Sequence, residues 1–270
     1  MKNKNLWILV AVFIVLALTF TFSDLAISQS YADPQSGWAY FIELYGQLPG
    51  VFVCFLGGST LLALYKIEMN FKSISGVIGL FILTLFTSLM FWGDALGAQA
   101  LPEEMNALPP LGLGFLMLLL VQVVLRRLPE ETLSQYKPAA KVALILIFVA
   151  GLLTVWSIKI PWGRWTFRDM LEIGDLSLFT PWYLPQGNNG HHSFISGHTA
   201  LSFCVLPIVL LFRKNKQQFI IAWALALTWG IIGALSRVKI GAHFPSDVLF
   251  GGGQTLLWFW ILQSKYIKNE

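Results

Sequence analysis

The sequence predicts an all-α fold, a polytopic membrane helix bundle of about eight transmembrane helices in a single domain, residues 1–270. Of the 270 residues, 56% are hydrophobic, and the mean hydropathy is +0.67. Only 12% are charged, whereas soluble proteins average about 25%. A chain of this length has too few charged side chains to form a surface that faces water, so lipid is the expected solvent for most of that surface.

Eight apolar segments approach the length of about 20 residues that a membrane-spanning helix needs. They are residues 6–22, 48–65, 74–92, 109–125, 142–158, 197–212, 219–235 and 246–264. The first could be a signal peptide, because Lys2 and Lys4 precede it and residues 26–28 form a weak cleavage site. Its apolar run exceeds the roughly 7–15 residues of a signal peptide, which favours a retained anchor.

The basic residues indicate how the spans are oriented. Most of the 18 Lys and Arg residues fall on the side of the N-terminus, and the connections 23–47 and 93–108 on the other side contain none. The positive-inside rule therefore places both termini in the cytoplasm of a multi-pass plasma-membrane protein. The net charge of +4 does not indicate nucleic-acid binding, since the basic residues form short clusters between apolar spans.

Five basic residues break this bias and lie on the predicted outer side. They are Lys159, Arg164, Arg168, Arg237 and Lys239. The four histidines, His191, His192, His198 and His243, fall in or beside the same two connections. A face that gathers cations and histidines is suited to an anion. Three segments carry all of these residues except His191 and His192.

The first segment, residues 159–169, follows the fifth predicted span. Lys159, Arg164 and Arg168 alternate there with aromatic residues. Such a belt can bind a substrate anion, or it can simply anchor the chain among lipid headgroups.

The second segment, residues 193–199, leads into the sixth predicted span. A helix N-terminus presents free backbone N–H groups that bind phosphate. Ser196 is a suitable N-cap, Gly197 permits close approach of a ligand, and His198 lies in the first turn. Without a ligand, the same pattern describes a capped helix with a histidine that faces headgroups.

The third segment, residues 236–247, connects the last two predicted spans. Pro245 is suited to the first turn of a helix. His243 and Asp247 are four residues apart, so their side chains can meet, and a carboxylate on one imidazole nitrogen leaves the other nitrogen free as a nucleophile. A plain structural pair is the alternative.

Together these segments resemble the signature of the type 2 phosphatidic acid phosphatase (PAP2) and vanadium haloperoxidase superfamily. That signature reads K-x6-R-P, then P-S-G-H, then S-R-x5-H-x3-D. The third motif is complete from Ser236 to Asp247, and the second has Ile195 in place of proline. In the first, Lys159 is present but the Arg-Pro positions hold Thr166 and Phe167.

The resemblance implies a role for each matching residue. His243 is similar to the nucleophile, Asp247 to its orienting partner, and His198 to the general acid. The phosphate cradle would be formed by Lys159, Arg237, Ser196 and Gly197, with Arg168 or Arg164 in place of the missing arginine. The later helices, residues 141–264, would form the catalytic core, and residues 1–140 would add further spans.

The predicted function is hydrolysis of a lipid phosphomonoester or diphosphate through a phosphohistidine, with no metal and no cofactor, at the outer membrane face. Phosphatidic acid, phosphatidylglycerophosphate, diacylglycerol pyrophosphate and polyprenyl phosphates all fit a cationic pocket beside lipid. The alternatives are a lipid phosphotransferase of the same fold, a haloperoxidase, and a catalytically impaired lipid-binding or transport protein. His191 and His192 are expected at the mouth of the site, and Cys54 and Cys204 as buried free thiols.

Overall fold

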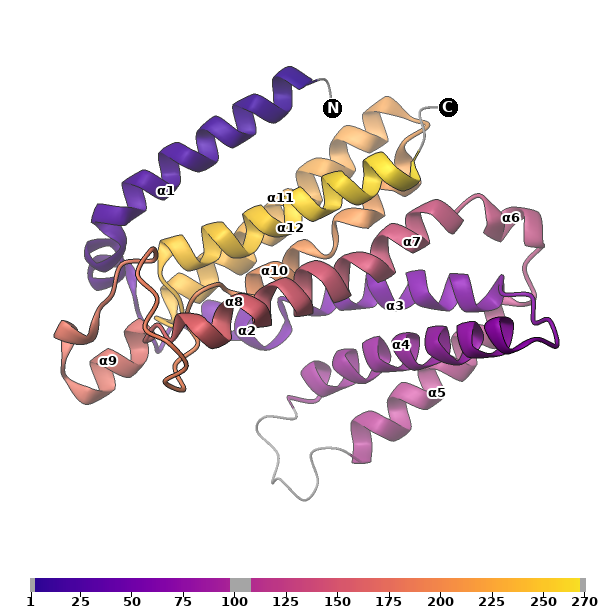
Figure 1. Cartoon of the computed structure of the whole chain (residues 1–270), viewed down its shortest axis with the longest axis horizontal. Coiled ribbons are helices and arrows are strands. Elements are labelled where there is room, and N and C mark those ends of the chain that lie inside the picture. Colours follow the sequence, from indigo (N-terminus) through magenta and orange to yellow (C-terminus); the bar gives the residue numbers. More distant parts are fainter. Residues whose placement is uncertain (1–2, 98–107, 268–270) are drawn as a thin grey trace.

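The computed structural model describes residues 3–97 and 108–267, which form helices and connections without a strand; the connection 179–196 is long and contains no helix. The long helices are α1 (Asn3–Tyr31), α3 (Leu48–Ala63), α4 (Phe71–Ala95), α5 (Leu108–Leu125), α7 (Lys137–Leu146), α11 (Lys216–Lys239) and α12 (Pro245–Tyr266). Successive neighbours run from α1 through α12, α7, α3 and α4 to α5 (Figure 1). The predicted all-α bundle is confirmed.

Shorter helices complete the bundle and shape its ends. They are α2 (Gly37–Tyr45), α6 (Glu130–Ser134), α8 (Val155–Trp162), α9 (Phe167–Ile173) and α10 (Gly197–Phe203). A π-helix, η3 (Ile147–Thr154), joins α7 to α8, and the 3-10 helices are η4 (Leu176–Leu178) and η5 (Leu206–Phe212). Cys54 and Cys204 are buried and free, as predicted.

Six helices are long and apolar enough to cross a membrane: Trp7–Tyr31, Gly37–Ala63, Phe71–Ala95, Leu108–Leu125, Lys137–Ile173 and Lys216–Lys239. They correspond to six of the eight predicted spans. Of the other two, residues 197–212 form only a shorter apolar helix. Residues 246–264 lie in α12, which is long enough but less apolar. Since α12 packs against α1, α7, α10 and α11, much of its surface faces protein and needs no lipid-compatible side chains.

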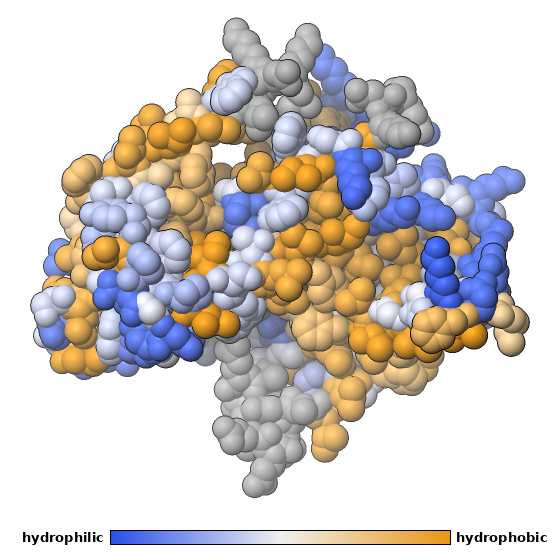
Figure 2. All heavy atoms as spheres, viewed as in Figure 1, coloured by the Kyte–Doolittle hydropathy of each residue, from blue (hydrophilic) through white to orange (hydrophobic). Residues whose placement is uncertain are grey.

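The surface agrees with a membrane location. Hydrophobic residues cover the middle of the face in Figure 2, and hydrophilic residues gather toward both ends of the bundle. One prediction needs correction at the first connection. Helix α1 continues to Tyr31, so Asp24, expected in an outer loop, lies within the helix and is only 1% exposed.

Candidate active site

The three segments singled out in the sequence meet at one end of the bundle, where backbone hydrogen bonds join them. The amide of Ser193 donates to the carbonyl of Arg164 over 2.9 Å, which links the second segment to the first. The amide of Ser196 donates to the carbonyl of Asp247 over 3.0 Å, which links the second to the third. Residues from three separate parts of the sequence therefore share one site.

His243 and Asp247 form the centre of this site. His243 lies just before α12, which begins at Pro245 as predicted. Its Nδ1 is 3.6 Å from Asp247 Oδ2, an ion-pair distance that is too long for a hydrogen bond. Burial lowers the pKa of His243 to about 4, so the imidazole is neutral at pH 7 and can act as a nucleophile.

Asp247 is held on both carboxylate oxygens. Oδ1 accepts from Arg164 over 2.5 Å. Oδ2, the oxygen nearest His243, accepts from the Ser193 hydroxyl over 2.5 Å and from the Phe244 amide over 2.9 Å. A fully buried carboxylate with these donors has a fixed orientation.

The Arg164 side chain is buried more deeply than a residue that binds phosphate would need to be. Its side chain is 1% exposed and points at carboxylates. Its hydrogen-bond acceptors are Thr180 O (2.9 Å), Ser246 Oγ (2.9 Å), Asp247 Oδ1 (2.5 Å) and Asp24 Oδ2 (2.9 Å). Arg164, which the sequence predicted to bind phosphate, is thus bonded to protein groups. This geometry favours a role in positioning Asp247.

The N-terminus of α10 borders the pair. Ser196 is its N-cap, as predicted, and accepts from the Thr199 amide over 3.3 Å. His198, in the first turn, lies close enough to His243 to interact with it electrostatically. Both predicted histidines therefore belong to one cluster.

Lys159 approaches the same helix end from α8. A Cβ placed on Gly197 would lie 4.0 Å from Lys159 Cε, so the lysine side chain passes beside the first turn of α10. Lys159 Nζ donates to the carbonyl of His192 over 2.5 Å. The lysine side chain therefore brings a cation to the N-terminal end of α10, where the helix dipole also favours an anion.

Two further arginines share a carboxylate that the sequence did not indicate. Glu43 Oε1, from α2, is 3.0 Å from Arg237 NH1 and 3.7 Å from Arg168 NH1. Arg237 is 5% exposed, and its Nε has no hydrogen-bond partner among the described residues. That unpartnered N–H can serve an anion.

Sequence reasoning missed Asp24 and Glu43, which both come from the N-terminal part of the chain. Asp24 carried a usable signal, because an ionisable residue inside a membrane helix is costly and usually functional. Glu43 carried none, since it lies in a mixed polar and apolar stretch before α3. Across residues 3–97 and 108–267, no three His, Cys, Asp or Glu side chains gather as a metal site would require.

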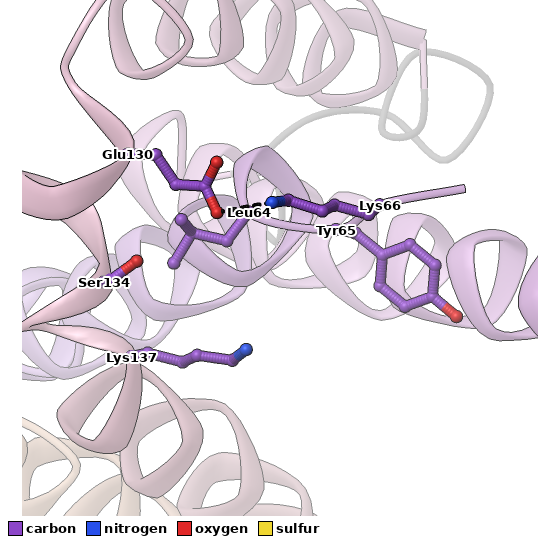
Figure 3. A pocket seen from close by; sticks show the side chains of 6 residues that line it. All are labelled: Leu64, Tyr65, Lys66, Glu130, Ser134 and Lys137. Carbon is purple, nitrogen blue, oxygen red and sulfur yellow. Dashed lines mark ion pairs between the residues drawn. The ribbon is translucent and has the colours of Figure 1, made fainter. Parts of the chain in front are cut away.

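A separate cavity of about 400 Å³ lies at the opposite end of the bundle. It is lined by Leu64, Tyr65, Lys66, Glu130, Ser134 and Lys137 (Figure 3). Lys66 and Glu130 pair across it over 2.8 Å, and both are exposed. None of the predicted site residues lines this cavity.

The fold and the site define an integral membrane helix bundle with a buried histidine–carboxylate pair and several cations at one end. Residues 139–269, just under half of the chain, match the profile of the PAP2 superfamily. These residues include all three segments, so the part of the chain that carries the motifs is similar to the PAP2 superfamily.

Among proteins of known function, the chain is similar to phosphatidylglycerophosphatase B of Bacillus subtilis (strain 168). The two are 34% identical over 92 residues, which is 31% of this chain and 43% of that protein. The match therefore spans less than half of the relative's length. No solved structure matches the chain significantly.

Proposed function

We propose that this protein is a membrane lipid phosphatase that hydrolyses a phosphomonoester or diphosphate of a lipid through a phosphohistidine at His243. The observation that carries the proposal is the buried His243 beside Asp247, within a segment that matches the PAP2 superfamily. The similarity to a phosphatidylglycerophosphatase makes phosphatidylglycerophosphate the first substrate to test.

The first chemical step forms a bond between His243 Nε2 and phosphorus and breaks the bond from phosphorus to the lipid oxygen. His198 donates the proton that the leaving oxygen needs. The imidazole becomes positively charged, and the Asp247 carboxylate stabilises that charge at Nδ1. In this proposal Lys159 and Arg237 neutralise the phosphoryl oxygens, which is supported by the unpartnered Nε of Arg237.

The second step transfers the phosphoryl group to water and restores the enzyme. Water attacks phosphorus, its proton passes to His198, and the bond from phosphorus to His243 breaks. No residue in this scheme requires a metal ion, so we expect phosphate release to persist with a chelator. An acceptor lipid in place of water would make the protein a phosphotransferase.

The proposed location of the chemistry is the outer face of the plasma membrane. The basic residues of the sequence favour cytoplasmic termini, and the site lies at the end of α12 opposite to its C-terminus. A substrate there could keep its tails in the bilayer while its phosphate enters the cationic end of the bundle.

The test uses the full chain in detergent with phosphatidylglycerophosphate, phosphatidic acid and a polyprenyl diphosphate. We expect His243→Ala to lower kcat by roughly 10⁴-fold or more, because no other residue replaces a nucleophile. The wild type should also acquire an acid-labile phosphoryl label, which the variant should lack. Full activity of His243→Ala would sink this mechanism, and a phosphorylated acceptor lipid without free phosphate would assign transfer in place of hydrolysis.

A further inference from the structure

Asp24 connects the first helix of the chain to the catalytic segment. It lies in α1 and is 1% exposed. Its Oδ1 accepts from the Ser246 amide over 2.9 Å. Its Oδ2 accepts from Arg164 over 2.9 Å and also from the Ser246 hydroxyl. All of these donors lie more than a hundred residues away in the sequence.

Arg164 bridges Asp24 to the carboxylate beside His243. It forms ion pairs with Asp24 and with Asp247, and all three side chains are at most 1% exposed. A buried ion that loses its partner is strongly destabilising, so each member depends on the others. With two carboxylates and one guanidinium, this three-residue cluster carries a net negative charge next to the imidazole.

We propose that Asp24 is a positioning residue of the active site, and that α1 is therefore part of the catalytic unit. Asp24 fixes Arg164 and Ser246, and through them the carboxylate of Asp247. The positive charge of Arg164 is divided between Asp24 and Asp247. The Asp247 carboxylate is therefore only partly neutralised, and it can stabilise the imidazolium that forms when His243 is phosphorylated. This inference rests on the proposed function and deepens it.

The test substitution is Asp24→Asn, which keeps the shape and removes the charge. We expect kcat to fall by about 10- to 100-fold, the scale of a small misplacement of catalytic groups. KM should change little, because Asp24 is 1% exposed and both of its carboxylate oxygens are already bonded to Arg164 or Ser246. A nearby negative charge favours protonated histidine, so its removal should move the acid limb of the pH–rate profile to lower pH.

The matched control is Asp33→Asn, which removes the same charge at a partly exposed pair, 3.5 Å from Lys239. It should retain the wild-type kcat and acid limb. A second variant, Ser246→Ala, removes the hydroxyl shared by Asp24 and Arg164 but no charge. We expect it to lower kcat by about 10-fold and to leave the acid limb in place.

The outcomes separate the two proposals. If wild type is active and His243→Ala is not, but Asp24→Asn matches Asp33→Asn in kcat and acid limb, the role of Asp24 is overturned and the phosphatase stands. If Asp24→Asn does not fold, a wild-type kcat in Ser246→Ala overturns the role of Asp24. A wild type that releases no phosphate from any of the lipids overturns both proposals.

Discussion

The two ends of the bundle each contain an ion pair of almost the same length in opposite surroundings. At the active-site end, Arg164 and Asp24 are 2.9 Å apart, with both side chains 1% exposed. At the opposite end, Lys66 and Glu130 are 2.8 Å apart, with side chains 77% and 60% exposed. The distance alone therefore does not indicate how much an ion pair contributes to stability, because water screens one pair and not the other.

This difference separates buried charges that fix the site from exposed charges that only cover the surface. The pairs of Arg164 lie behind His243 and fix the carboxylate that faces it. At the other end, an exposed pair such as Lys66 and Glu130 stays solvated in many side-chain arrangements. Only the buried charges depend on particular partner residues, so substitutions at the two ends should have very different effects on stability.

The largest expected effect is that of Arg164→Ala. It leaves Asp24 and Asp247 buried without their counter-ion, and we expect the free energy of unfolding to fall by about 3–5 kcal/mol. Lys66→Ala, the matched change at the other end, should alter it by at most about 1 kcal/mol. Denaturation of both variants in one detergent tests the comparison, and equal losses would contradict it.

The active-site end should also make the stability depend on pH. The folded pKa of His243 is about 4, below the ordinary value of about 6.5. Between these values the unfolded chain binds the proton and the folded protein does not, so stability falls as the pH falls through this window.

For this one group we expect a loss of about 2 kcal/mol between pH 7 and pH 5. The measurement is the stability of wild type minus that of His243→Gln at each pH. A difference that does not change between the two pH values would show that His243 is not a buried neutral imidazole.

The smallest of these effects concerns packing. A Cβ on Gly251 of α12 would lie 2.4 Å from the Ser196 carbonyl oxygen, so Gly251→Ala must push the N-terminus of α10 away. We expect a loss of about 1–2 kcal/mol. Gly79 of α4 has no atom within 4 Å of its added Cβ, so Gly79→Ala should gain up to about 1 kcal/mol. Thermal melts of both variants check the contrast, which fails if Gly251→Ala is as stable as Gly79→Ala.

The sequence predicted the local features of the site well, because they depend on short spacings. The four-residue interval predicted that His243 and Asp247 face one another, and residue type predicted Ser196 as a helix cap; the structure has both. Spacing could not show which partner each cation takes. Arg164, predicted beside a phosphate, is bonded to two carboxylates that lie 140 and 83 residues away.

The sequence by itself determined that this chain is a membrane helix bundle, since too few charges are available for a water-facing surface. It also determined that the C-terminal part resembles the PAP2 signature, with the third motif complete. Only the tertiary structure decided that α1 and α2 contribute Asp24 and Glu43 to the same end of the bundle. The physical reason is that pairing between distant buried charges depends on how helices pack, and periodicity and spacing report only what neighbours along the chain do.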